Sequence, residues 1–332
     1  MRTSEFLRSV EASCTGTMDR RELIRHVATL LAGAAVGASG KLEAQQQAAG
    51  TDRFFPGFKA SKVQTSGATI NLVSGGSGPP LLLLHGAPQS HVSWRLIAPQ
   101  LATEFTVIAT DLGGYADSSK PADGDNHVNY SKRAMALDQV EVMKHFGFDR
   151  FAVVGHDRGA RVTHRMALDH PDKVTKAAVL DIIPTYYLYT HVDIQFIQAY
   201  FHWFQNVRPM PIPENSIKAD VEAGAARATT DVQLEYLRIN RDPVNIHGMC
   251  EDYRAGASID LDHDRADLDH KIACPLLALW GERGAMGRLY KPLDIWRERG
   301  SKVTGKGLPG GHNLQEEVPD LVLAEIRSFL RA

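Results

Sequence analysis

Short apolar runs alternate with amphipathic stretches along most of the chain after residue 50. The apolar runs predict buried strands in the segments 81–86, 105–114, 151–159, 176–184, 274–282 and 301–312. The stretches with helical spacing predict helices over 91–103, 130–147, 160–171 and 320–332. Strands that alternate with helices in this way indicate an α/β fold with a mostly parallel sheet and helices on both faces.

The alternation stops between 184 and 268, where the sequence is rich in aromatic residues and mostly helical in pattern. We therefore predict a core formed by residues 51–183 and 269–332, and a helical cap formed by residues 184–268. In open α/β sheets, ligands bind at the carboxyl ends of the strands, so the cap would cover the ligand site.

The first 50 residues differ from the rest of the chain. Arg20 and Arg21 precede a mildly apolar stretch and then small and polar residues, which is typical of a twin-arginine-like export signal followed by a linker. We expect export to the periplasm; the alternative is a disordered or amphipathic extension on a cytoplasmic protein. No apolar run reaches 18 residues, so no membrane contact is expected of the mature chain.

The composition narrows the function to a small-molecule enzyme. A net charge of -2 with 23% charged residues gives no basic excess, which argues against a nucleic-acid partner. Cys14, Cys250 and Cys274 fit no zinc site, and only a disulfide between the last two stays open. The segment 260–270 has many Asp and two His without ligand spacing, so we expect a solvated acidic helix or loop and no metal.

The sequence "GHDRGAR" at 155–161 has the form of a nucleophile elbow with Asp157 at its centre. Gly155 and Gly159 would let the backbone turn sharply between strand and helix. The loop "HGAPQ" at 85–89 follows an earlier strand. We expect the backbone N–H groups of Ala87 and Arg158 to form an oxyanion hole.

A nucleophile of this kind requires a histidine as base and an acid that orients the histidine. His312 lies in a glycine-flanked loop after the last predicted strand and before a helix, the position expected for a catalytic base. Asp181, at the end of its strand, is the favoured acid to orient this histidine. Glu282, at the end of the next strand, is its rival.

A carboxylate nucleophile indicates a particular chemistry. When a carboxylate attacks a saturated carbon that bears a leaving group, the product is an alkyl ester. A water molecule activated by His312 can then cleave this ester at its carbonyl carbon. The expected substrate is therefore an alkyl halide or an epoxide. Arg158 and Arg161 lie three positions apart, on one helix face beside Asp157. Two arginines so close to the nucleophile indicate that they bind a carboxylate of the substrate, and this interpretation is favoured over a role in structural ion pairs.

Three residues of the cap offer donors for a leaving halide. They are His202, Trp203 and Tyr253, with an imidazole N–H, an indole N–H and a phenol O–H. From the residues alone, a packed aromatic core of the cap explains this cluster equally well.

From about Phe55 to the C-terminus the chain resembles the haloacetate dehalogenases, including fluoroacetate dehalogenases. The resemblance rests on "LLLLHGAPQS", "GHDRGAR", "VLDIIPTY", "HW" at 202–203, "CEDYRAGA" at 250–257, "LALWG" and "GH" at 311–312. It implies the α/β-hydrolase fold with a helical cap inserted after strand 6, a homodimer and no cofactor.

The same resemblance implies roles for the site residues. Asp157 would be the nucleophile, His312 the base and Asp181 its orienting acid. The remaining assignments are carboxylate binding by Arg158 and Arg161, and halide binding by His202, Trp203 and Tyr253.

Two departures from the family pattern suggest a larger pocket and a bulkier 2-halo acid than fluoroacetate. Ala87 stands where relatives carry a bulky aromatic residue. The stretch between Asn215 and Arg238 is short, and we expect it to lack a lid helix.

Two other functions stay open. An epoxide hydrolase would use the same Asp/His/Asp set with cap tyrosines, for which Tyr186, Tyr187, Tyr189 and Tyr253 are available. A non-catalytic receptor or scaffold is the other alternative, and it fits poorly with a complete catalytic set.

Overall fold

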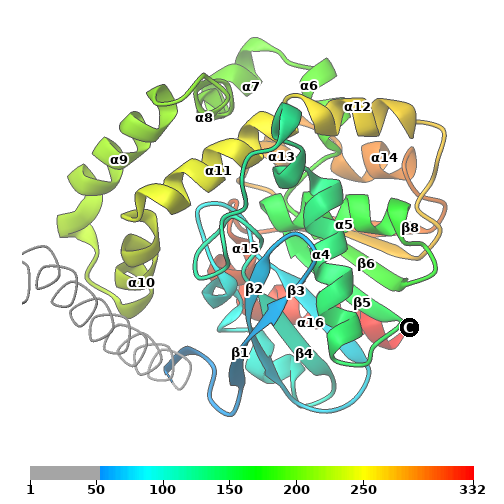
Figure 1. Ribbon diagram of the computed structural model, residues 1–332. Helices are drawn as coiled ribbons and strands as arrows, with labels where there is room; N and C mark the ends of the chain where they lie inside the picture. Colours follow the sequence, from blue (N-terminus) through cyan, green and yellow to red (C-terminus); the bar gives the residue numbers. More distant parts are fainter. Residues whose placement is uncertain (1–52) are drawn as a thin grey trace, which may run out of the picture. The chain divides into compact units, whose positions relative to one another are not determined.

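The computed structural model describes residues 53–332, which form an eight-stranded sheet flanked by helices (Figure 1). The strand order is β1-β2-β4-β3-β5-β6-β7-β8, and only the pairings of β2 with β1 and β4 are antiparallel. The strands are β1 (Lys59–Gln64), β2 (Thr69–Gly75), β3 (Pro80–Leu84), β4 (Thr106–Thr110), β5 (Phe151–His156), β6 (Val174–Leu180), β7 (Leu276–Gly281) and β8 (Val303–Leu308). This is the α/β-hydrolase fold.

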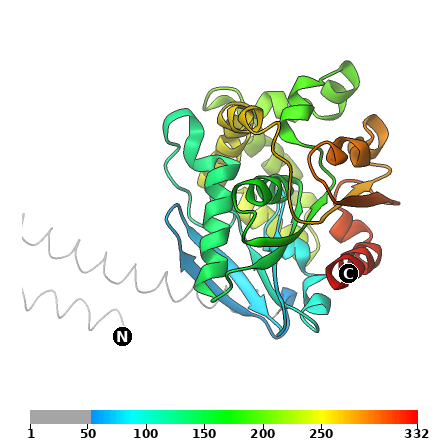
Figure 2. The same cartoon turned by 90° about the vertical axis from the view of Figure 1, so that its right-hand side faces the viewer.

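Helices cover both faces of the sheet, as Figure 2 shows for α4 and α16 on opposite sides. The core helices are η1 (His91–Trp94), α3 (Ala98–Leu101), η2 (Asp125–Tyr130), α4 (Lys132–His145), α5 (Asp157–Asp169), α13 (Ala285–Leu289), α14 (Pro292–Arg297), α15 (Leu314–Glu317) and α16 (Pro319–Arg331). Met135 and Met166 belong to the apolar cluster on one face, and Trp94 and Ile326 to that on the other. Burial on both faces explains why the central strands are continuously apolar.

Two local predictions differ from the structure. The helix expected over 91–103 is two short helices, because Pro99 has no N–H to continue a helical hydrogen-bond ladder. Strands β1 and β2 were not predicted. β1 is mostly exposed and polar, and β2, although mostly buried, pairs antiparallel with β1 and so lies outside the alternation of strands and helices.

Helices α6 to α12 lie between β6 and β7 and form the cap-like insertion (Figure 1). Their bounds are α6 (Thr185–Thr190), α7 (Ile194–Ala199), α8 (Phe201–Asn206), α9 (Ile212–Gly224), η3 (Ala225–Arg227), α10 (Asp231–Asn240), α11 (Pro243–Gly256) and α12 (Ile259–Ala266). The expectation that the stretch from Asn215 to Arg238 lacks a lid helix is wrong. It holds most of α9 and α10, and a Thr230 capping box begins α10.

The acidic segment 260–270 is not simply solvated. Asp260 and Asp264 of α12 are buried. The backbone N–H of Lys132 donates to Asp260 at 2.8 Å, and Arg165 pairs with Asp264 at 3.6 Å. These carboxylates therefore join the insertion to α4 and α5.

Two further expectations concern the cysteines and the membrane. Cys250 and Cys274 are free thiols, so they form no disulfide with each other, and Cys14 lies outside the described residues, as does the predicted export signal. Within 53–332, no helix combines the length and apolar character that crossing a bilayer requires.

Candidate active site

Asp157 lies at a sharp turn between β5 and α5, where its backbone adopts φ 44°. The two glycines around it are required by close packing. A Cβ on Gly155 would come within 2.4 Å of the Gly159 carbonyl oxygen, and a Cβ on Gly159 within 2.5 Å of the Leu84 carbonyl oxygen. The backbone can therefore make the elbow only with glycine at both positions, as the motif predicted.

The Asp157 carboxylate is almost fully buried beside the loop after β3. The backbone N–H of Ala87 donates to its Oδ2 at 3.0 Å. Burial raises the pKa of Asp157, but the positive charges of His312, Arg158 and Arg161 outweigh it and hold this pKa below the usual range. The carboxylate is therefore ionised at neutral pH, as a nucleophile must be.

His312 lies in the loop after β8, next to Asp181. Its Nδ1 is 2.6 Å from Asp181 Oδ2, and Asp181 Oδ1 accepts a hydrogen bond from the Gly281 N–H at 2.8 Å. Glu282 is exposed, and its side chain lies beside Gly307 instead. Of the two acids considered from the sequence, the structure places Asp181 against the histidine.

The charge state of His312 depends on its acidic neighbours. Burial lowers the pKa of His312, but the hydrogen bond with Asp181 and the charges of Asp157 and Asp181 outweigh it, and the pKa is raised overall. The imidazole is thus electrostatically coupled to Asp157 as well as hydrogen-bonded to Asp181.

His156, which the sequence analysis did not single out, lies behind His312. Its Nε2 is 2.9 Å from the His312 carbonyl oxygen, and its Nδ1 is 3.1 Å from Gln315 Nε2. Burial and the charge of His312 lower the pKa of His156 to about 3, so this ring is neutral. It therefore donates to the backbone of His312 and accepts from Gln315, which fixes the loop that carries the histidine.

Arg158 is fully buried and stacks on aromatic rings of the cap. Its guanidinium carbon lies 3.5 Å from the ring centre of Tyr253 and 4.6 Å from that of Trp203. Among residues 53–332, none accepts a hydrogen bond from any of its three guanidinium nitrogens. Buried guanidinium groups normally have acceptors. Because Nε faces Asp252 at 3.5 Å, Nη1 and Nη2 are the donors available to an anionic ligand.

A buried polar network lies behind Arg158. Asp252 Oδ2 is 3.5 Å from Arg158 Nε and accepts a hydrogen bond from the Tyr115 hydroxyl at 2.6 Å. Its Oδ1 pairs with Lys132, which in turn contacts Asp260 at 3.3 Å. These positions lie far apart in sequence and form no local motif, which is why the sequence analysis missed them.

Arg161 is held differently. Its Nη1 donates to the Ile183 carbonyl oxygen at 3.1 Å and to the Thr185 hydroxyl at 3.0 Å, and its guanidinium carbon lies 4.6 Å from the Trp203 ring centre. Burial and the charge of Arg158 lower its pKa. One edge of Arg161 is thus fixed by neutral groups, which orients the cation without neutralising it.

The three predicted halide donors lie together in the cap. Tyr253 has its ring centre 6.0 Å from that of His202 and 5.9 Å from that of Trp203. Burial and the charge of Arg158 lower the pKa of His202 to about 4. Burial raises the pKa of Tyr253 to about 12. At neutral pH each side chain is therefore uncharged and carries a proton that it can donate.

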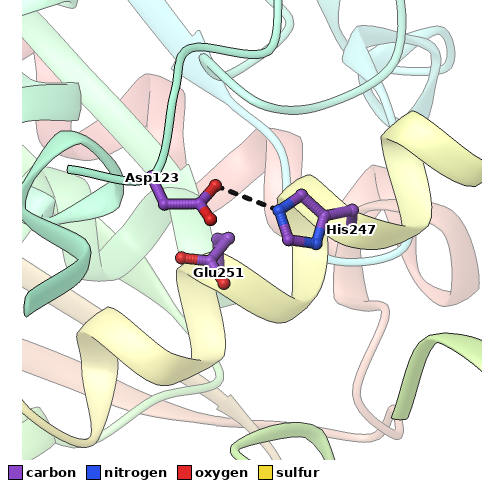
Figure 3. Close-up of side chains that lie close together, drawn as sticks. All are labelled: Asp123, His247 and Glu251. Atoms are coloured by element: carbon purple, nitrogen blue, oxygen red, sulfur yellow. Dashed lines mark hydrogen bonds and ion pairs between the residues drawn. The ribbon is translucent and has the colours of Figure 1, made fainter. Parts of the chain in front are cut away.

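A separate group of possible metal ligands, Asp123, His247 and Glu251, lies at the edge of the cap (Figure 3). His247 Nε2 is 3.0 Å from Asp123, and its Nδ1 is 3.2 Å from Glu214. Arg254 pairs with Glu251 at 2.7 Å and with Glu214 at 2.8 Å. These groups already satisfy one another, so we interpret them as an ion-pair link between α9, α11 and the core.

Comparison with known proteins places this geometry in a family. Residues 79–299 match the family model described as the alpha/beta hydrolase fold. The chain is 46% identical to a fluoroacetate dehalogenase of Burkholderia sp. over 83% of this chain and 95% of the relative. It is 33% identical to a soluble epoxide hydrolase of Corynebacterium sp. over 80% of this chain and 94% of the relative.

A solved structure agrees with these sequence relatives. An alpha/beta hydrolase of Nostoc sp. superposes with a TM-score of 0.80 at 52% identity, over 82% of this chain and 98% of the other. The protein is thus a member of the α/β-hydrolase family, related within it to a fluoroacetate dehalogenase and to an epoxide hydrolase.

Proposed function

We propose that the protein hydrolyses the carbon–halogen bond of small 2-halo acids of the haloacetate type. The observation that carries this proposal is the buried guanidinium of Arg158, which follows Asp157 in the chain. Its Nη1 and Nη2 have no hydrogen-bond acceptor among the described residues. A substrate carboxylate would supply the missing acceptors, and Arg161 would provide a second cation.

In the first step Asp157 displaces the halide. Ala87 holds Oδ2, so Oδ1 attacks the α-carbon from the side opposite the halogen. The new Oδ1–Cα bond forms as the carbon–halogen bond breaks, and the electron pair of that bond leaves with the halide. His202, Trp203 and Tyr253 would donate protons in hydrogen bonds to the departing ion.

In the second step water cleaves the aspartyl ester. His312 accepts a proton from water, whose oxygen attacks the Asp157 carboxyl carbon. The Ala87 and Arg158 backbone N–H groups stabilise the resulting oxyanion. The bond between the carboxyl carbon and Oδ1 then breaks, and His312 returns its proton to the departing oxygen, which releases the 2-hydroxy acid. The second proton of the water passes to solvent and Asp157 is restored as a carboxylate, while Asp181 stabilises the imidazolium until its proton leaves.

The test is a single turnover in ¹⁸O water with bromoacetate or fluoroacetate. Halide should be released, the first product molecule should be unlabelled, and Asp157 should carry the heavy oxygen. Direct appearance of label in the first product would overturn the proposal, because water would then attack the substrate itself.

Epoxide hydrolysis is the second candidate, and the 33% identity to a soluble epoxide hydrolase favours it. Tyr253 and Tyr189 lie near the arginines, and the Tyr189 hydroxyl is buried without a partner among the described residues. Tyr186 and Tyr187 instead border a separate cavity beside Arg299. Diol formation from styrene oxide without halide release from haloacetates would favour this candidate.

A further inference from the structure

A cavity of about 480 Å³, open to solvent, lies in the cap beside the candidate active site. Ala87, His202 and Tyr253 border it at the catalytic end. Its other end reaches α9 and α10, and a haloacetate ion carries no group that could contact these helices. Cavities of this size in proteins hold ligands with many more atoms.

Most of the wall of this cavity is apolar. Ile217 and Val221 of α9, Leu237 of α10 and Met249 of α11 line it, and each is at least partly buried. Besides His202 and Tyr253, the polar side chains of the lining are Asn206, Gln233, Tyr236 and Asn240, and its charged residues, Asp220 and Arg227, lie at exposed positions. An apolar chain would thus meet mainly apolar side chains, and its far end would approach solvent.

The helices around the cavity are fixed to their surroundings. On α10, Asn240 Nδ2 donates to the Pro88 carbonyl oxygen at 2.8 Å, and the Tyr236 hydroxyl donates to Glu316 at 3.1 Å. Arg241, just after α10, pairs with Glu222 of α9 at 3.0 Å. That pair is exposed, but Glu214 of α9 also pairs with the buried Arg254 of α11 at 2.8 Å. Both helices that line the cavity are thus attached to neighbouring elements.

Ala87 connects the cavity with the proposed reaction, because it lines the cavity and its backbone N–H contacts Asp157. In the proposed reaction the carboxylate is bound by Arg158 and Arg161, and the α-carbon faces Asp157. The small side chain of Ala87, whose N–H contacts Asp157, leaves the cavity side open to a further substituent.

We propose that the preferred substrates are 2-haloalkanoic acids with an unbranched apolar chain on the α-carbon. This inference rests on the proposed function and adds to it the class of side chain. The chain would lie between α9 and α10, against Val221 and Leu237, while the acid and the halogen occupy the site described above.

The test compares 2-bromopropanoate, 2-bromobutanoate, 2-bromohexanoate and 2-bromooctanoate, which all react at a secondary carbon, with bromide release as the readout and bromoacetate as the unsubstituted reference. Within this series we expect kcat/KM to rise by about fourfold per added methylene until the cavity is filled, as expected for burial of each group. A steady fall of kcat/KM along the series would overturn the inference, with the proposed function intact if bromoacetate reacts.

Cavity-filling variants locate the effect. Val221→Trp should abolish the gain for the longer acids and leave kcat/KM for bromoacetate unchanged. Ala219→Trp adds the same ring at an exposed position of α9 outside the cavity, so it should behave like the wild type. Leu237→Trp fills the same space from α10 and replaces the first variant if that one does not fold.

The outcomes separate the two proposals. If bromoacetate does not react, the proposed function fails, and binding of hexanoate and octanoate by calorimetry then decides whether the cavity takes an acid with an apolar chain. If Val221→Trp and Leu237→Trp both fold and keep the full preference for longer acids, the chain does not bind between α9 and α10.

Discussion

Arg158 Nε lies 3.5 Å from Asp252 Oδ2, and both side chains are fully buried. Asp252 thus balances the charge of the arginine that we assign to the substrate carboxylate. Tyr115 and Lys132 hold Asp252 from the other side. The cation can therefore be kept inside the protein before any anion binds.

This pairing predicts the effect of Asp252→Asn. Removal of the carboxylate charge leaves Arg158 and Lys132 undercompensated, so the free energy of unfolding should fall by about 3–5 kcal/mol. Glycolate, the product of haloacetate hydrolysis, should raise Tm more in this variant than in the wild type, because its carboxylate replaces the lost charge.

Tyr115→Phe is the matched control for this prediction. It removes a hydrogen bond to Asp252 without changing charge, and should cost about 1–2 kcal/mol. Equal shifts of Tm by glycolate in the wild type and in Asp252→Asn would show that Asp252 does not balance the binding cation.

The second prediction distinguishes Asp181 from Glu282 as the partner of His312. Asp181→Asn should slow ester hydrolysis by about a hundredfold to ten-thousandfold, because the imidazole loses its negative partner. Glu282→Gln should have no effect, since Glu282 is exposed and lies beside Gly307. Pre-steady-state halide release and steady-state turnover measure the two steps separately.

His312→Gln should stop the reaction after the first step. Without a base the aspartyl ester persists, so the intact protein should gain the mass of the acid minus its halogen, on the peptide that contains Asp157. Asp157→Asn should show neither the adduct nor halide release. An adduct on any other residue would contradict the assignment of the nucleophile.

The fourth prediction concerns the titration of His312. The charge of Asp157 is one of the causes that raise the pKa of His312. Asp157→Asn should therefore lower this pKa, as measured by NMR of the imidazole, and Glu282→Gln should leave it unchanged. A pKa of His312 that is unaltered in Asp157→Asn would mean that the two groups are not coupled.

The coupling has a consequence for the pH profile. Esterification removes the charge of Asp157, so the pKa of His312 should be lower in the intermediate than in the free enzyme. If the neutral imidazole is the base, as proposed, the acid limb of kcat should lie at lower pH than the titration of the free enzyme indicates.

The fifth prediction concerns the ion-pair link formed by His247 (Figure 3). Burial lowers the pKa of His247, but hydrogen bonds with Asp123 and Glu214 outweigh it and raise the pKa overall. The charged form thus stabilises the fold at pH values below the ordinary histidine pKa of about 6.5. This contribution is lost as pH rises through the raised pKa.

His247→Gln should remove that part of the pH dependence. The difference in stability between variant and wild type should be largest at pH 5–6 and should shrink above neutral pH, as measured by urea unfolding at several pH values. A difference that grows with rising pH would contradict the link.

The chain shows which features a sequence reveals. Asp157 and His312 each belong to a local pattern, an apolar strand followed by a glycine-rich turn, so their placement was predictable. Asp252 was not, because its partners Tyr115 and Lys132 come from distant segments. The helices α9 and α10 were not predicted either, because the expectation for residues 215–238 rested on the length of that stretch.

The burial of charged residues is equally hard to predict from the sequence. The acidic run 260–270 was expected to be solvated, but Asp260 and Asp264 are buried because cations from α4 and α5 meet them. Periodicity predicts which apolar residues face the core, whereas a buried charge depends on a partner that only the fold brings near.

Asp157 and Asp181 both adopt left-handed backbone conformations, with φ 44° and φ 52°. Such conformations cost an aspartate energy that glycine would not lose. Asp157 is assigned to attack and Asp181 to orienting the base. At both positions the fold thus loses stability in exchange for the geometry that the reaction requires. Substitutions at these two positions that relieve the backbone strain should therefore stabilise the protein. Selection for thermal stability alone would favour such substitutions and would reduce activity.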